Sequence, residues 1–219
     1  MSYLSLTVFA MLIFVSSVCG QSPARDSANQ AWIEQQLAFP LNKRVDLVLL
    51  GYLHFGKKTE RPIAEHAGTG IGASVSLGKH VTIFPFYTHF ENQTATAVRS
   101  KEERFTLETT LKFPIEKFTL SYRDRFEYHW RQPRLNFIHS RHRFQIEHPL
   151  GWHNVNWFAG DEFFYDTHFS AWIRNRAYAG VAKKFNRHLT LEFYYLRQND
   201  GHSHPGDLNV FGNTLKFRL

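Results

Sequence analysis

Hydrophobic and polar residues alternate along most of the chain, most clearly over residues 104–113. Phe105, Leu107 and Leu111 occupy one set of positions there, and charged or hydroxyl side chains occupy the other. A period of two is typical of a β-strand with one apolar and one polar face. The alternation returns over residues 118–130 after a short turn, so the two stretches are predicted to form an antiparallel hairpin.

Similar stretches follow one another along the chain, and no helical pattern competes with them. Short turns alternate with longer polar loops between them. Pro85 interrupts one stretch and predicts a bulge or a break in its hydrogen-bond ladder, because proline has no N–H to donate. The predicted strands cover residues 32–39, 45–55, 63–77, 81–90, 104–113, 118–130, 135–147, 155–165, 172–184, 189–197 and 208–219.

The length of the strands indicates the kind of sheet. They exceed the five or so residues that a soluble sandwich needs, and about nine to eleven tilted residues cross a bilayer. Trp130, Tyr165 and Tyr195 are expected in one aromatic girdle, and Trp152 and Trp157 in the other. The predicted fold is therefore all-β: a single, closed, antiparallel transmembrane β-barrel of about 10–12 strands with meander topology.

A count of eleven conflicts with the even strand number expected of a bacterial barrel. Either the segment 32–39 is only a partial strand, or the long segment 63–77, which contains three glycines, is two strands. The pattern leaves both alternatives open.

The amino terminus predicts export. Residues 1–20 contain an apolar run followed by small residues, which is typical of a cleaved signal peptide. The only cysteine is Cys19, and Val18 before it disfavours lipid attachment. Residues 21–30 are then expected to be a flexible segment outside the wall, and residues 31–219 the barrel. The predicted location is the outer membrane of a Gram-negative bacterium.

Charge and hydropathy agree with this location. The chain of 219 residues has a net charge of +7 and is 16% aromatic, and its mean hydropathy of −0.37 suits strands that average two faces. Behind a signal peptide, the basic charge favours outer-membrane lipids, including lipopolysaccharide, over nucleic acid. The last strand, with Leu215, Phe217 and Leu219 on one face, predicts recognition by the barrel-assembly machinery.

Several short motifs add a family resemblance. They are Trp32 with the following PLNKRVDL, then YRDRFEYHW, HSRHRFQIE, GDEFF, NRAYAGV and the final NTLKFRL. Together they resemble the bacterial family called domain of unknown function 2490 (DUF2490). The resemblance implies an outer-membrane barrel and supplies no activity, substrate or catalytic residue.

Charged residues gather on the polar faces of neighbouring predicted strands. In a narrow lumen, arginine paired with carboxylate is a workable filling. We interpret the set as a structural charge ladder that plugs the barrel, or alternatively as the lining of a narrow pore that selects anions. The ladder comprises Glu108, Arg123, Arg125, Glu127, Arg141, Arg143, Glu147, Glu162, Arg174, Arg176 and Glu192.

A second basic group lies at the predicted loops. If these loops face outward, the side chains reach the level of lipopolysaccharide phosphates, which Lys and Arg bind. The alternative is an ordinary solvated loop. The group comprises Lys57, Lys58, Arg61, Arg99, Lys101, Arg131 and Arg134.

Catalytic and metal chemistry have weaker signals. His202 with Ser203, or His139 with Ser140, could serve a lipid esterase, but adjacent residues on a strand point to opposite faces. His202 and His204 could share a metal, but a site needs further ligands, and the nearby Asp200 and Asp207 are a weak signal for them. The sequence thus assigns no catalytic residue, metal or cofactor. It favours a non-enzymatic barrel, structural or a narrow pore, with a lipid A or phospholipid esterase as the alternative and the oligomeric state open.

Overall fold

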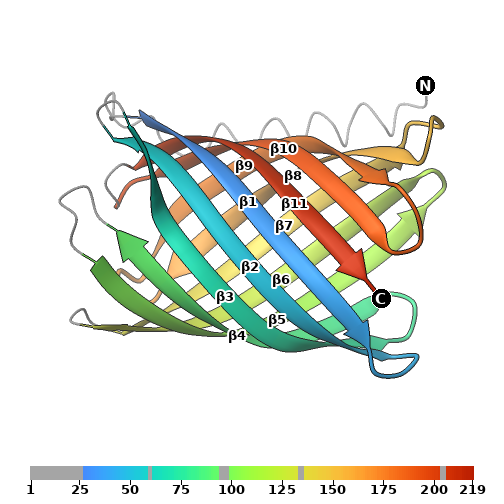
Figure 1. Cartoon of the computed structure of the whole chain (residues 1–219), viewed down its shortest axis with the longest axis horizontal. Coiled ribbons are helices and arrows are strands. Elements are labelled where there is room, and N and C mark those ends of the chain that lie inside the picture. Colours follow the sequence, from blue (N-terminus) through green and yellow to red (C-terminus); the bar gives the residue numbers. More distant parts are fainter. Residues whose placement is uncertain (1–26, 59–60, 94–98, 133–135, 203–205) are drawn as a thin grey trace.

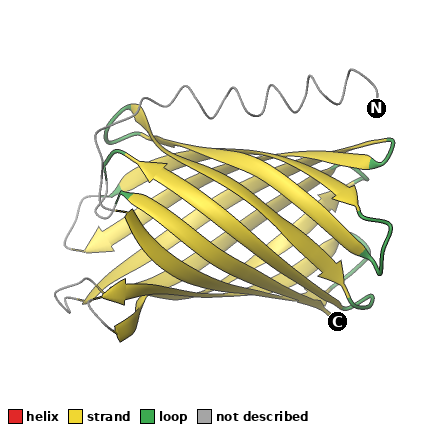
Figure 2. Cartoon of the chain, turned by 90° about the horizontal axis from the view of Figure 1, so that it is seen from above, coloured by secondary structure: helices red, strands yellow, loops and turns green. Residues whose placement is uncertain are grey.

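The computed structural model describes residues 27–58, 61–93, 99–132, 136–202 and 206–219, with only the backbone of residues 27, 57, 58, 61–65, 93, 99 and 132. These residues form one closed barrel of eleven strands (Figure 1). Figure 2 shows the same barrel from above, with its strands tilted across the long axis. Among the described residues no helix has the length and apolarity needed to cross a membrane.

Each predicted stretch corresponds to one strand, so the predicted all-β barrel is confirmed. Most strands extend the predicted stretches, by up to five residues, because polar residues at their ends still pair. β7 instead begins two residues later than predicted, and β11 ends one residue earlier. The strands are β1 (Ser27–Pro40), β2 (Val45–Lys58), β3 (Arg61–Leu77), β4 (Val81–Gln93), β5 (Arg99–Ile115), β6 (Phe118–Gln132), β7 (Phe137–Pro149), β8 (Val155–Asp166), β9 (Ala171–Lys184), β10 (Leu189–Asp200) and β11 (Asp207–Arg218).

The barrel closes through one parallel pair. Successive strands are antiparallel, but β1 pairs in parallel with β11, from Ser27 opposite Asp207 to Ala38 opposite Arg218. This pair makes an odd number possible, so the expectation of an even number is wrong. β1 is a complete strand and β3 is a single one. Residues 27–30, expected outside the wall, are also part of β1.

Proline and two bulges mark the irregular points of the wall. Pairing between β3 and β4 lapses opposite Pro85 and resumes without a register shift, which is the predicted break. Bulges occur at His54/Phe55 and at Phe164/Tyr165. The β4 to β5 pairing continues through Pro85.

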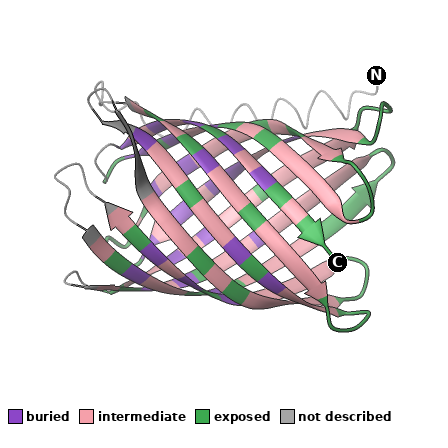
Figure 3. Cartoon of the chain, in the orientation of Figure 1, coloured by how far each residue is buried: buried purple, intermediate pink, exposed green. Residues whose placement is uncertain are grey.

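The two faces of the wall differ as the alternation predicts. Phe105, Leu107 and Phe126 point outward and are 42%, 43% and 45% exposed. The intervening charged residues point into the lumen, where Arg123 and Glu127 are buried. Along β11, for example, buried positions alternate with intermediate or exposed ones (Figure 3).

Glycines let aromatic rings fill one side of the lumen. Gly68, Gly70 and Gly72 of β3 lie opposite Phe90, Thr88 and Phe86 of β4. A Cβ on Gly68 would come within 2.2 Å of the Phe90 ring. The lumen is therefore narrow here because rings occupy the space that side chains on β3 would need.

The connections divide between the two ends of the barrel. Turns of two to five residues join the strands at what we call the turn end, for example at Gly78 and Glu116, both with positive φ. The connections at the opposite end, which we call the loop end, have two to six residues, so the predicted contrast between short turns and long loops is small, because strand pairing extends into the predicted loops. Because the strand number is odd, β1 begins at the loop end and β11 finishes at the turn end.

Candidate functional site

Six of the predicted ladder residues form one connected network, which we call the lumen network. They project inward from four adjacent strands, β5 to β8, because each occupies an inward position of its alternating strand. The network contains three carboxylates and three guanidinium groups and is therefore electrically balanced. Its members are Glu108, Glu127, Glu162, Arg123, Arg125 and Arg141.

Each carboxylate of the lumen network receives two of these arginines. Glu108 accepts hydrogen bonds from Arg125 Nε at 2.9 Å and Nη2 at 2.5 Å, with Arg123 Nη1 at 3.7 Å. Glu127 accepts a bond of 2.7 Å from Arg141 Nη1 and has Arg125 Nη1 at 3.6 Å. Glu162 accepts bonds of 3.0 and 3.1 Å from Arg141 Nη2 and another from Arg123. Carboxylates and guanidinium groups therefore alternate through the network. This arrangement reduces the repulsion between the arginines that pair in register on β6 and β7.

The other five predicted ladder residues also face the lumen but have different partners. Arg174 pairs with Asp200 at 2.5 Å, and Lys216 with Glu192 at 2.5 Å. Glu147 accepts a 2.6 Å bond from Asn156. Arg143 lies 5.7 Å from the Tyr178 ring, and Arg176 donates to Gln198 Oε1 at 2.8 Å.

A cavity of about 390 Å³ occupies the loop-end half of the lumen, which we call the loop-end cavity. Its lining includes Arg125, Glu127 and Arg141, but not the next inward residues toward the turn end, Arg123 and Arg143. The lumen network therefore lies at its base. The charged residues of the inner wall that line the cavity are Arg104, Arg125, Arg131, Arg141, Arg174, Arg176, Glu34, Glu102 and Glu127.

The loop-end cavity combines excess positive charge with an aromatic wall. Six arginines face three glutamates there. The rings of Trp32, His54, His66 and Phe90 stack in sequence, at centroid distances of 4.3, 4.9 and 4.2 Å. Arg176 lies 4.9 Å from the Trp32 ring at one end of this stack. Arg104 lies 4.7 Å from the Phe90 ring at the other.

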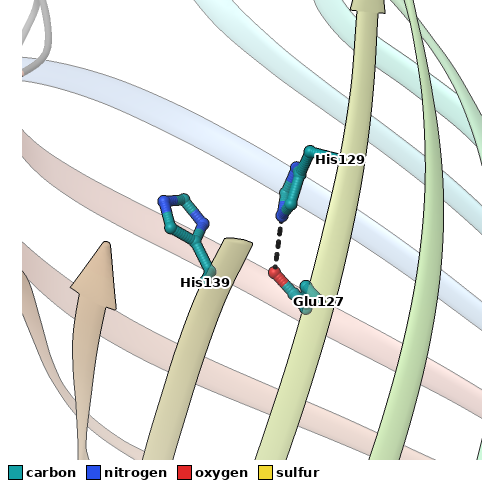
Figure 4. Close-up of side chains that lie close together, drawn as sticks. All are labelled: Glu127, His129 and His139. Atoms are coloured by element: carbon teal, nitrogen blue, oxygen red, sulfur yellow. Dashed lines mark hydrogen bonds and ion pairs between the residues drawn. The ribbon is translucent and has the colours of Figure 1, made fainter. Parts of the chain in front are cut away.

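Glu127, His129 and His139 form the group that best resembles a metal site (Figure 4). One ligand atom from each lies within 4.8 Å of the others. However, His129 Nδ1 is 2.7 Å from Glu102, and His139 Nε2 is 2.9 Å from Asp166. Arg141 also donates to Glu127. A divalent cation would have to displace these partners and approach a guanidinium, so the arrangement fits an ion-pair cluster better than a metal centre.

The described members of the basic loop group differ in where their side chains lie. Arg131 differs from the expected lipid contact: it points inward, donates to Glu102 at 2.6 Å and lies 4.4 Å from the Phe137 ring. Lys101 is exposed near the loop end of β5. Lys57, Lys58, Arg61 and Arg99 lie at the loop ends of their strands, with side chains outside the described residues, as is all of Arg134.

The two expected esterase pairs are not assembled in the described residues. His139 points into the lumen toward Asp166, whereas Ser140 points outward. Ser203 lies outside the described residues. Ser140 instead lies beside His142, with 3.1 Å between its Oγ and His142 Nε2.

Sequence reasoning missed several cavity residues. Arg104 begins the predicted strand 104–113 but is not part of the predicted ladder, and Glu102 lies just before that strand; both continue the inward alternation of β5. Glu34 and Trp32 lie on β1, where few charges mark the polar face. Extending each strand by its period of two would have found Glu102, but not its contact with His129, which lies 27 residues away on the paired strand β6.

The chain matches the model of a known protein family. The model of the DUF2490 family, described as a protein of unknown function, matches residues 29–209. A comparison with curated protein sequences finds no match.

Among solved structures, an outer membrane protein of Vibrio cholerae, OmpT, is similar, with a TM-score of 0.41, 11% identity and 78% of this chain covered. An anion-selective porin from Comamonas acidovorans is similar with a TM-score of 0.37, 8% identity and 77% coverage. The chain spans only 60% and 56% of these two structures. On the match over residues 29–209, the chain belongs to the DUF2490 family.

Proposed function

We propose that this protein is an outer-membrane barrel that does not conduct solutes and that binds a small anion in its loop-end cavity. The anion carries phosphate or carboxylate groups. The apolar outward face and its aromatic residues near both ends support the membrane location. In this orientation the loop end faces the outside, with the basic loop residues near lipopolysaccharide phosphates, and the barrel-assembly machinery inserts the chain.

The observation that carries anion binding is the excess of arginine around the loop-end cavity. Outside the balanced lumen network, the cavity is lined by Arg104, Arg131, Arg174 and Arg176 against Glu34 and Glu102, and Arg174 pairs with Asp200, so one arginine is in surplus. Arg176 is the clearest case, because its recorded partners are the Gln198 amide and the faces of Trp32 and Phe164. A guanidinium held by neutral groups in a low-dielectric lumen gains strongly from an anion.

The residues at the base of the loop-end cavity support the proposal that the lumen is closed. Ion pairs link β5 through β8 across the lumen. Beside them, on the nearby strands β2 and β4, Val48, Leu50 and Phe86 form a buried cluster. Ions crossing the barrel would have to break paired charges that are costly to separate.

Anion binding is tested by titrating the full-length protein in detergent micelles with inorganic phosphate and with benzoate, using calorimetry. Arg176→Gln is expected to weaken binding about tenfold or more, because one charge-assisted hydrogen bond is lost. Arg197→Gln is the matched control, since Arg197 pairs with Asp207 and Asn209 at the outer surface. Equal binding by both variants, or no binding by the unmodified protein, would overturn the proposal.

Closure is tested separately in planar bilayers. The unmodified protein is expected to give no steady single-channel conductance. Reproducible open-channel steps would show a pore and contradict the closed lumen.

A further inference from the structure

A polar group interrupts the outward apolar face where β6 and β7 pair. Ser140 and His142 are two residues apart on β7, so both point outward. Asp124 of β6 is the register partner of His142. The three side chains therefore come together on the outside of the barrel, away from the loop-end cavity.

Their distances match a nucleophile, a base and an orienting carboxylate. Ser140 Oγ lies 3.1 Å from His142 Nε2, and His142 Nδ1 lies 3.3 Å from Asp124 Oδ1. Tyr122 Oη is 2.8 Å from the same Nδ1. Hydroxyl, imidazole and carboxylate in this order are the arrangement that activates serine for acyl transfer.

A proton on one of the two ring nitrogens would satisfy the buried oxygen of the carboxylate. Asp124 Oδ1 is buried and accepts no hydrogen bond of ordinary geometry in the described part of the chain. A proton on His142 Nδ1 gives this oxygen a donor. Nε2 is then unprotonated and can accept the proton of Ser140 Oγ–H, as a general base must.

The group is accessible and lies at a suitable depth. The side chains of His142 and Asp124 are 29% and 47% exposed. Trp172, 59% exposed near the loop end of β9, lies 5.6 Å from the His142 ring. Ser140 is three residues from the loop end of β7, or about 10 Å along the strand. Aromatic girdles mark the boundary between headgroups and acyl chains, where the ester bonds of lipids lie.

The stability of the barrel does not explain why polar and ionisable side chains occupy these outward positions. An ionisable side chain on the lipid face of a barrel costs free energy that an apolar one would not. The neighbouring outward residues Phe126 and Phe144 are apolar, 45% and 49% exposed, and suited to contact an acyl chain.

We propose that Ser140, His142 and Asp124 form a serine esterase site on the outer wall, which hydrolyses an acyl ester of an outer-leaflet lipid. The site goes beyond the proposed anion binding and shares no residue with it. It requires the proposed membrane location only for access to its substrate.

The reaction proceeds in two balanced halves. Ser140 Oγ bonds to the ester carbonyl carbon while its proton passes to His142 Nε2; the carbon–oxygen bond to the lipid alcohol then breaks, and that oxygen takes the proton from Nε2. Water next attacks the acyl-Ser140 ester, giving its proton to Nε2. The bond to Oγ breaks, Oγ regains a proton, and a fatty acid is released.

The first test is labelling of the folded full-length protein in detergent with a fluorophosphonate probe, which reacts with activated serines. The unmodified protein is expected to be labelled, Ser140→Ala not at all, and His142→Gln at a rate lower by about 10³-fold or more. His148→Gln, an outward histidine of the same strand, and Ser76→Ala are controls expected to label normally. Heat-modified migration in gels shows that each variant has folded.

The second test measures fatty-acid release from phosphatidylethanolamine vesicles and, separately, from lipid A. Release from either by the unmodified protein, but not by Ser140→Ala, identifies the substrate source. Folded protein that is neither labelled nor able to release fatty acid from both lipids would overturn the proposal. Labelling that persists in Ser140→Ala would also overturn it. Neither result bears on phosphate binding in the loop-end cavity.

Discussion

At the scale of single residues, the interior is governed by the cost of buried charge. Arg141 shows this most directly: it donates to Glu127 and Glu162 and lies 4.4 Å from the Phe164 ring. A guanidinium without such partners would be strongly destabilising in a narrow lumen. Each carboxylate in the lumen network therefore stabilises two arginines.

Glu162→Gln is the corresponding test. It leaves the pairs to Arg123 and Arg141 without their carboxylate, so the free energy of unfolding should fall by about 3 kcal/mol or more. Urea unfolding of the protein in lipid vesicles, followed by tryptophan fluorescence, measures the change. Glu192→Gln is the comparison, because its partner Lys216 is 41% exposed; a loss below about 1 kcal/mol is expected there. Equal losses in both variants would mean that the lumen network does not act as a unit.

At the scale of the strand, β3 and β4 pack closely because small residues of β3 lie opposite large side chains of β4. The inward positions of β3 carry glycine where β4 carries Phe86, Thr88 and Phe90. A Cβ on Gly72 would lie 2.4 Å from Phe86 Cβ and 2.5 Å from the Pro85 carbonyl oxygen. Backbone cannot move away as a flexible side chain can, so these glycines are required for close approach.

Gly72→Ala should therefore destabilise the barrel by about 2 kcal/mol or prevent folding. Gly51→Ala provides the matched control, because the nearest atoms to its added Cβ lie at 3.7 Å; a change within about 0.5 kcal/mol is expected. The same urea titration measures both. An unchanged free energy of unfolding for Gly72→Ala would contradict this, because it would mean that β3 and β4 can move apart to make room for the added methyl group.

At the scale of the whole molecule, the parallel pair of β1 and β11 determines where the ends of the chain lie. Asn209 Nδ2 donates to Asn29 Oδ1 at 3.2 Å across this pair, near the loop end. Arg218 pairs with Asp46 at 3.0 Å near the turn end. An antiparallel closure of the same residues would instead bring Asn29 close to Phe217.

Cysteine pairs distinguish these closures. In a Cys19→Ser background, Asn29→Cys with Asn209→Cys should form a disulfide on mild oxidation and shift the migration of the unreduced protein. Asn29→Cys with Phe217→Cys should not, because these residues lie toward opposite ends of the parallel pair. The reverse result would show that the strands at the seam are antiparallel.

The sequence alone determined the local structure and its sidedness. Alternation with a period of two is a property of neighbouring residues, so the stretch from Phe105 to Phe126 already predicted long strands, apolar side chains outside and charges within. Pro85 similarly predicted the break in its hydrogen-bond ladder. The motifs spread along the chain predicted the DUF2490 family.

Only the tertiary structure decided what depends on register and closure. No local pattern indicates the parallel pairing of β1 with β11. This pairing is what lets an odd number of strands close into a barrel. Register between β6, β7 and β8 decided that Arg123 and Arg141 share Glu162, and that Asp124 of β6 meets His142 of β7. Neighbouring residues on one strand face opposite sides, whereas residues far apart in sequence meet across strands. Such contacts exist only once the sheet has closed.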